Sequence, residues 1–163
     1  MLQVYYGNGK GKTSAAVGAA VRAAGAGMRV LFFSFFKNGD SSECAVLKKI
    51  PGVVFAVPDE SYELFETLND DKKQRLRTAY EALLHRAEKE NWDVLVLDEA
   101  LEAISLRLLT GSAVLALKQK GELILTGHRL PAEIEARADY ITRFSNERHP
   151  YERGVAARHG IEF

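Results

Sequence analysis

The feature that most constrains the fold of this chain is an eight-residue stretch near its start, Gly7-Asn8-Gly9-Lys10-Gly11-Lys12-Thr13-Ser14. A short apolar run precedes it over residues 2–6, and an alanine-rich segment with helical patterning follows over 13–24. A strand, a glycine-rich turn and a helix in this order favour binding of nucleotide phosphates. Glycines let backbone N–H groups surround the anion without a Cβ in the way, and the positive end of the helix faces it.

Two residues of the stretch have side chains suited to this chemistry. Lys12 supplies a mobile cation for phosphate oxygens, and the hydroxyl of Thr13 can ligate Mg²⁺. The usual motif begins with a glycine six residues before the lysine, and here that position is Tyr6. A glycine-rich turn that only joins a strand to a helix is the alternative. The Gly-Lys-Thr ending in this strand-to-helix context favours the nucleotide loop.

Composition and charge narrow the class of protein. The chain of 163 residues is long enough for one well-packed domain, so we expect a single nucleotide-binding domain over 1–163. Lys and Arg together number 22, as do Asp and Glu, which argues against a nucleic-acid partner. The longest apolar run, over 30–36, is too short to span a bilayer, so no membrane association is expected. With no signal peptide visible, we expect a cytoplasmic protein.

Apolar runs and helical patterns alternate along the rest of the sequence. The runs lie at residues 29–36, 53–57, 93–97, 122–126 and 140–144, with amphipathic or alanine-rich segments between most of them. This alternation is typical of a parallel sheet with helices on both faces. The predicted fold class is therefore α/β, a single domain of the P-loop NTPase-like (RecA-like) kind.

An acidic pair follows one of these runs, at Asp98 and Glu99. Carboxylates at this position of a nucleotide-binding sheet hold Mg²⁺ directly or through water, opposite the Thr13 hydroxyl. Because adjacent side chains point in different directions, we expect only one of the two to reach the metal.

Three further polar residues follow strand ends and are candidate phosphate or substrate contacts, namely Lys37, His128 and Arg129. Right-handed crossovers place the carboxyl ends of parallel strands at one edge of the sheet, which would bring these residues near the loop. Ordinary solvated turns are the alternative for each.

Residues 58–71 lack periodicity and contain Tyr62 and Phe65 among acidic residues. This segment is either a lid or substrate loop, or a stretch that packs on the domain's own surface. The polar tail over 145–163 carries several arginines and could fold back over the site.

Over nearly its full length the chain resembles the P-loop ATP:corrinoid adenosyltransferases, which complete adenosylcobalamin. Their nucleotide loop also lacks the first glycine. Other segments similar in order and spacing are Arg22 to Gly27, Phe36-Lys37, Val96 to Glu99, Thr126-Gly127, Ala138-Asp139, and His149 to Tyr151 with Gly154, Gly160 and Ile161.

The resemblance implies transfer of the 5′-deoxyadenosyl group of ATP to the cobalt of a reduced Co(I) corrinoid, with release of triphosphate. ATP would be the co-substrate and Mg²⁺ the cofactor; a reductase would supply Co(I), and the protein would be a homodimer. Because cobalt is the nucleophile, no activated serine, cysteine or histidine is required. The residues implied for ATP and Mg²⁺ are Lys10 and Lys12 on the phosphates, Thr13 with Glu99 on the metal, Gly7, Asn8, Gly9, Gly11 and Ser14 lining the loop, and Arg22 reaching the phosphates.

The sequence also departs from the family's pattern. The family's Phe-Thr-Trp segment has no tryptophan counterpart over 58–70, where Tyr62 and Phe65 are candidate replacements. His128 stands where an arginine is usual. Two alternatives therefore stay open: a diverged P-loop ATPase or phosphotransferase with another substrate, and a non-catalytic ATP-binding regulator.

Overall fold

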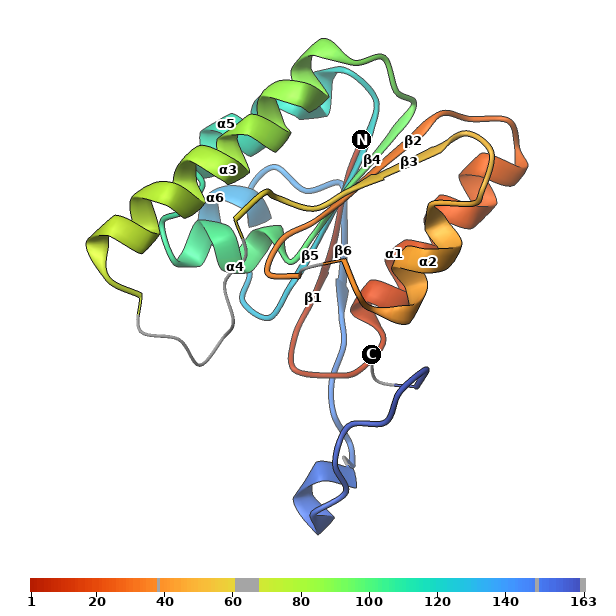
Figure 1. Ribbon diagram of the computed structural model, residues 1–163, viewed down its shortest axis with the longest axis vertical. Helices are drawn as coiled ribbons and strands as arrows, with labels where there is room; N and C mark the ends of the chain where they lie inside the picture. The colour runs from red at the N-terminus through yellow and green to blue at the C-terminus, as the bar shows by residue number, and fades with distance from the viewer. Residues whose placement is uncertain (38, 61–67, 149, 162–163) are drawn as a thin grey trace.

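A computed structural model describes residues 1–37, 39–60, 68–148 and 150–161. Its centre is a six-stranded sheet in which every pair of neighbouring strands is parallel, in the order β3-β2-β4-β5-β1-β6 (Figure 1). The strands are β1 (Leu2–Tyr6), β2 (Val30–Ser34), β3 (Val53–Ala56), β4 (Val94–Asp98), β5 (Glu122–Gly127) and β6 (Tyr140–Arg143). The prediction of a parallel α/β sheet is confirmed.

Helices cover both faces of the sheet, as predicted (Figure 1). α1 (Lys12–Gly25) and α2 (Ser42–Leu47) lie on one face. The other face is covered by α3 (Asp70–Lys89), α4 (Ala100–Ser105), α5 (Gly111–Ala116) and α6 (Ala132–Glu135). Two 3₁₀ turns, η1 (Leu117–Gln119) and η2 (Pro150–Arg153), complete the described elements.

The two layers of core follow from the alternation of side chains along a strand. On β2, Phe32 packs on the α1 face with Ala16 and Ala20, while Leu31 and Phe33 pack on the opposite face. The small alanines of α1 let this helix lie close to the sheet, which fixes the position of its N-terminus. Strands β2 and β4 are buried over their whole length, as expected for central parallel strands.

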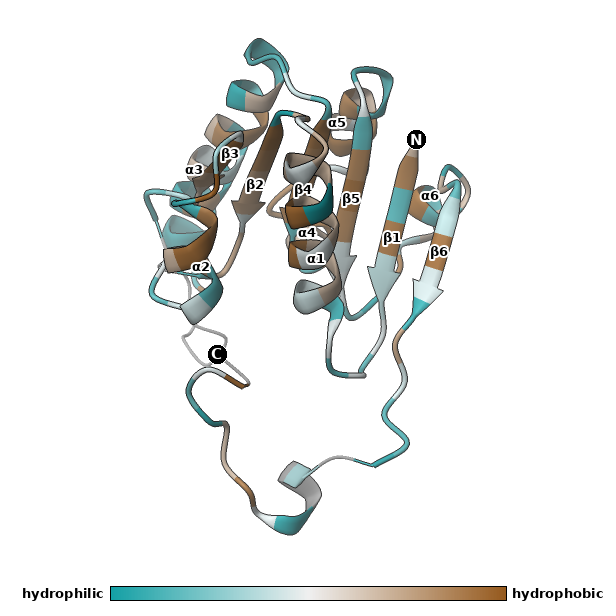
Figure 2. Cartoon of the chain, turned by 90° about the vertical axis from the view of Figure 1, so that its right-hand side faces the viewer, coloured by the Kyte–Doolittle hydropathy of each residue, from teal (hydrophilic) through white to brown (hydrophobic). Residues whose placement is uncertain are grey.

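The strand order places β5 between β1 and β4. The nucleotide loop follows β1 and the acidic pair begins at the end of β4, so the two motifs are separated by one strand. After β6 the chain leaves the sheet, passes through η2 and turns back toward α2 (Figure 2). Within the described part of the chain, no helix has the length and apolar character needed to cross a membrane.

Candidate functional site

The loop between β1 and α1 is held by the ends of two neighbouring strands. The backbone N–H of Gly7 donates to the carbonyls of Gly127 (3.2 Å) and His128 (3.1 Å), and that of Gly9 donates to Phe144 O (2.9 Å). A Cβ on Gly9 would lie 2.7 Å from both Phe144 C and Ser145 N. Gly9 is therefore needed for close packing against the chain after β6, in addition to the role in phosphate binding that the sequence predicts.

Lys12 begins α1, and its side chain turns back over the loop. Its Nζ donates to the carbonyl of Gly9 at 2.9 Å. Burial lowers the pKa of Lys12, against the opposing influence of Glu102, Glu99 and Asp98. The ammonium is thus held at the mouth of the loop, where a phosphate could replace its contact with the carbonyl.

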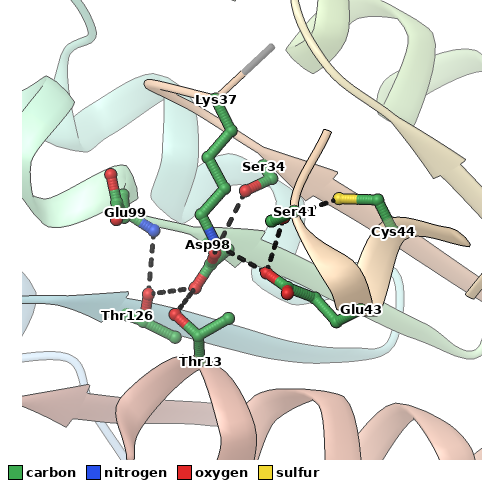
Figure 3. A network of polar contacts seen from close by, with 9 residues as sticks. All are labelled: Thr13, Ser34, Lys37, Ser41, Glu43, Cys44, Asp98, Glu99 and Thr126. Carbon is green, nitrogen blue, oxygen red and sulfur yellow. Dashed lines mark hydrogen bonds and ion pairs between the residues drawn. The ribbon is translucent and has the colours of Figure 1, made fainter. Parts of the chain in front are cut away.

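Asp98, at the end of β4, is the centre of the site's hydrogen-bond network (Figure 3). Its side chain is fully buried, and its carboxylate contacts four donors. Oδ1 accepts from the hydroxyls of Thr126 (2.7 Å) and Thr13 (2.9 Å); Oδ2 accepts from Ser34 (3.0 Å) and lies 3.2 Å from Lys37 Nζ. These contacts satisfy the carboxylate and bring together three strands and the first turn of α1.

The contact with Asp98 also fixes how Thr13 presents its oxygen. Thr13 donates its only hydroxyl proton to Asp98, so the remaining lone pairs of Oγ1 are available to a cation. Because all four acceptor positions of the Asp98 carboxylate are used, the geometry favours an indirect role for Asp98, which orients Thr13.

Glu99 follows Asp98 with a left-handed backbone, at φ 62°. Its N–H donates to Thr126 Oγ1 at 2.8 Å, and Figure 3 shows its carboxylate lying apart from that of Asp98. This separation agrees with the expectation that the two acids point in different directions. Burial, followed by the neighbouring charge of Asp98, raises the pKa of Glu99 to about 7.

Lys37 lies between two carboxylates at the other side of the network. Its Nζ is 2.8 Å from Glu43 Oε1 and 3.2 Å from Asp98 Oδ2. Burial by itself lowers the pKa of Lys37, but the charges of Asp98 and Glu43 outweigh burial and raise the pKa above its ordinary value. Lys37 is therefore a charged member of the site.

Two adjoining cavities open at this edge of the sheet. The larger, about 390 Å³, is lined by Thr13, Ser14, Val17, Lys37, Ser42, Glu43, Glu99, Gly160 and Ile161. The smaller, about 160 Å³, is lined by Lys10, Gly11, Lys12, Thr13, Ser14, Glu99, Thr126, Gly127, His128 and Ile161. The two cavities are neighbours, because both are lined by Thr13, Ser14, Glu99 and Ile161. The C-terminal tail returns to them through Gly160 and Ile161.

His128 is placed in the smaller cavity by Glu102. The Glu102 carboxylate accepts from the His128 backbone N–H (2.9 Å) and lies 3.2 Å from His128 Nδ1. Eight of the sequence-predicted residues line the cavities, namely Lys10, Gly11, Lys12, Thr13, Ser14, Lys37, Glu99 and His128. Arg129 is not among the described residues lining either cavity.

Arg22 requires a correction. It lies in the last turn of α1, about 15 Å along the helix from Lys12 at 1.5 Å per residue. Within one chain it is at the opposite end of the helix from the loop, so it does not reach phosphates bound there. The expectation for Arg22 came from the family resemblance and not from helix geometry. Tyr62 and Phe65 lie outside the described residues.

Sequence reasoning missed three polar residues that contact the site's charged groups. Thr126 bridges Asp98 and the backbone of Glu99, Ser34 bonds Asp98, and Glu43 bonds Lys37. A signal was present for two of them, since Thr126 and Ser34 are polar residues at the ends of otherwise apolar strands. Glu43 carries no such signal, because an acid in a short helix is normally solvated.

Curated relatives match this chain over its full length. A corrinoid adenosyltransferase of Pseudomonas aeruginosa is 32% identical over 171 residues, covering all of this chain and 83% of that protein. Those of Escherichia coli K12 and Salmonella typhimurium are 28% and 30% identical, each match covering all of this chain and 85% of the relative. Among solved structures, a genome packaging NTPase, B204, from Sulfolobus turreted icosahedral virus 2 gives a TM-score of 0.48 at 19% identity, covering 93% of this chain and 77% of that one.

The family model described as ATP:corrinoid adenosyltransferase BtuR/CobO/CobP matches residues 1–163. This match spans the loop, the acidic strand and the tail that returns to the cavities. The chain belongs to the ATP:corrinoid adenosyltransferase family.

Proposed function

We propose that this protein transfers the 5′-deoxyadenosyl group of ATP to the cobalt of a reduced Co(I) corrinoid and releases triphosphate. The family match over the whole chain supports the reaction. The observation that carries the nucleotide half is the 2.9 Å hydrogen bond from Thr13 to Asp98, which joins the glycine-rich loop to the acidic strand. Both motifs thereby face the same pair of cavities.

In this reaction the protein would position the two substrates and supply positive charge to the triphosphate leaving group. An electron pair of Co(I) forms the cobalt–carbon bond to C5′, the C5′–O bond breaks, and triphosphate leaves with that bond's electron pair. No protein nucleophile takes part. Lys12 lines the smaller cavity and Lys37 lines the larger one. Both would stabilise the negative charge that develops on the leaving group. Lys10 and Ser14 would add contacts to the phosphates.

The residues present fit a magnesium ion bound together with the nucleotide. Thr13 offers a hydroxyl oxygen whose proton is already donated, and the Glu99 carboxylate lines the same cavities. Among the described residues there is no group of three or more His, Cys, Asp or Glu that could hold a metal. That agrees with a magnesium site completed by phosphates and water. When bound, Mg²⁺ would supply positive charge to the triphosphate.

The partners follow from the reaction. The corrinoid must arrive as Co(I), so we propose that a reductase supplies the electron. Tyr62 and Phe65 remain predicted corrinoid contacts. The homodimer and the cytoplasmic location likewise remain predictions.

One observation favours a second function, hydrolysis of ATP. Glu99 lines both cavities, and in the ligand-free protein its pKa is raised to about 7, which suits a general base for a water molecule. A diverged ATPase would release ADP and phosphate, whereas the adenosyltransferase would release triphosphate.

The products decide between these functions. Incubation with ATP, Mg²⁺ and chemically reduced cobalamin is expected to give the absorption spectrum of a cobalt–carbon bond and one triphosphate per corrinoid. Controls omit the reductant or the cobalamin. Release of ADP without a cobalt–carbon bond would establish hydrolysis, and ATP binding without any turnover would indicate a nucleotide-binding regulator.

A further inference from the structure

A chain of polar contacts extends from the site into α2, beyond the residues that the reaction uses. Lys37 Nζ contacts Asp98 and Glu43, and Glu43 Oε1 also accepts a hydrogen bond from Ser41 Oγ at 2.8 Å. Figure 3 shows this chain running from Asp98 through Lys37 to Glu43 and Ser41. Glu43 is in the first turn of α2 and lines the larger cavity, so it is attached to a helix while facing the site.

The backbone before Lys37 is also fixed. Phe36 has a left-handed φ of 56°, and its N–H donates to the Tyr80 hydroxyl at 3.3 Å. The ring of Tyr80 lies 4.7 Å from that of Phe35 and 5.5 Å from that of Phe36, measured between centroids. An L-residue adopts this conformation only when its surroundings impose it, so the turn that aims Lys37 back toward Asp98 is built into the fold.

The two carboxylates are not equivalent partners of Lys37. Asp98 already accepts three hydroxyl hydrogen bonds, and its distance to Lys37 is the longer of the two, 3.2 Å against 2.8 Å for Glu43. A cation bound at Thr13 would compete with Lys37 for the charge of Asp98. Thr13 contacts Asp98 Oδ1, whereas Lys37 lies against Oδ2 and against Glu43, whose carboxylate points toward Lys37 (Figure 3). Glu43 would therefore retain the ammonium.

We propose that Glu43 is a positioning residue for nucleotide binding: it anchors Lys37 at the wall of the cavity, where the ammonium contacts the triphosphate portion of ATP. This inference rests on the proposed function for the identity of the nucleotide. In the ligand-free protein Lys37 balances the charge of Asp98, and on nucleotide binding it turns to the phosphates without leaving Glu43. Ser41 supports the anchor by fixing the oxygen that Lys37 contacts.

The test is a double-mutant cycle read out by binding, without corrinoid. Dissociation constants for Mg-ATP and for inorganic triphosphate are measured by calorimetry for the wild type, Glu43→Gln, Lys37→Met and the double variant. Loss of a charge-assisted contact is worth about tenfold in affinity, so Glu43→Gln is expected to weaken both ligands by about that factor. In the Lys37→Met background the same substitution is expected to change affinity less than twofold.

Matched variants separate positioning from folding. Glu88→Gln removes an exposed carboxylate that contacts His85 on α3, and it should leave both dissociation constants unchanged. Ser41→Ala keeps the Glu43–Lys37 pair and should weaken binding in the same direction by a smaller factor; it also serves as the test if Glu43→Gln does not fold. Unchanged affinity in both variants, or an undiminished Glu43→Gln effect in the Lys37→Met background, would overturn the proposal.

The adenosylation assay is run separately on the same variants. A protein that binds ATP but forms no cobalt–carbon bond contradicts the proposed function, and the binding cycle still reports on Glu43. If adenosylation proceeds and the cycle shows no coupling, only the role of Glu43 fails.

Discussion

Thr13 Oγ1 lies 2.9 Å from Asp98 Oδ1, although 85 positions separate the two residues in the sequence. This hydrogen bond crosses the sheet from α1, which follows β1, to the end of β4, with β5 between them. The intervening strand β5 takes part as well, because the hydroxyl of Thr126 contacts the same oxygen of Asp98 at 2.7 Å. The intervening strand thus strengthens the link between the loop and the acidic strand.

Replacement of Lys12 by alanine tests the loop itself. Among the residues that the structure describes, the ammonium donates a hydrogen bond to a backbone carbonyl at 2.9 Å, so its loss should change the unfolding free energy by less than about 1 kcal/mol. Mg-ATP binding should weaken by at least about tenfold, because a charged phosphate contact is removed. Calorimetry measures the affinity, and Lys89→Ala, at the end of α3, is the control for loss of a lysine. Wild-type affinity in Lys12→Ala would mean that the phosphates bind elsewhere.

Replacement of Thr126 by valine tests the bridge between Asp98 and Glu99. Valine keeps the shape of threonine but removes the hydroxyl that donates to Asp98 and accepts from the Glu99 N–H. We expect a loss of about 1–3 kcal/mol in unfolding free energy, measured by urea denaturation. Thr142→Val on the exposed strand β6 is the matched control and should change stability by less than about 0.5 kcal/mol. Equal stability of the two variants would contradict the bridging role.

Local sequence patterns predict most of the strands and helices and part of the candidate site. The apolar runs located the strands because central parallel strands are buried on both faces, and Asp98 was recognisable as the polar end of such a run. The position of β5 between β1 and β4 depends on which strands pair, and no local pattern encodes that choice.

The polar residue Glu43 could not be predicted for a similar reason, because its contact depends on the tertiary fold and not on local sequence. The contact of Glu43 with Lys37 forms between a loop and a short helix that the fold brings together, so neither residue's local pattern contains it. The phosphate contact expected for Arg22 rests on the family resemblance alone. The length of α1 separates Arg22 from the loop, and this separation follows from helix geometry.

The pKa of Glu99 predicts a pH dependence of stability in the ligand-free protein. Burial and Asp98 raise this pKa from 4.5 to about 7, so between these pH values the folded state keeps a proton that the unfolded state has lost. Stability therefore falls as pH rises through this window, by up to about 3 kcal/mol.

Glu99→Gln is expected to remove that contribution and to be more stable than the wild type at pH 8, with little difference at pH 4. Denaturant titrations across this range measure the effect. The control Glu88→Gln alters an exposed carboxylate and should follow the wild-type curve. Parallel pH profiles for the wild type and Glu99→Gln would show that the Glu99 pKa is not raised. The same variant should also require more Mg²⁺ for ATP binding if Glu99 contacts the metal.

Two glycines, Gly9 in the loop and Gly18 in α1, differ in how closely other atoms pack against them. A Cβ on Gly9 would lie 2.7 Å from backbone atoms of Phe144 and Ser145. A Cβ on Gly18 in α1 would have no described heavy atom within 4 Å, apart from the backbone of its own helix and its chain neighbours. Gly9→Ala should therefore displace the loop from the chain after β6, lowering stability by about 1–3 kcal/mol and weakening Mg-ATP binding. Gly18→Ala should stabilise the helix by about 0.5–1 kcal/mol and leave binding unchanged. Thermal unfolding and calorimetry measure both quantities, and wild-type ATP affinity in Gly9→Ala would show that contact with the segment after β6 does not shape the loop.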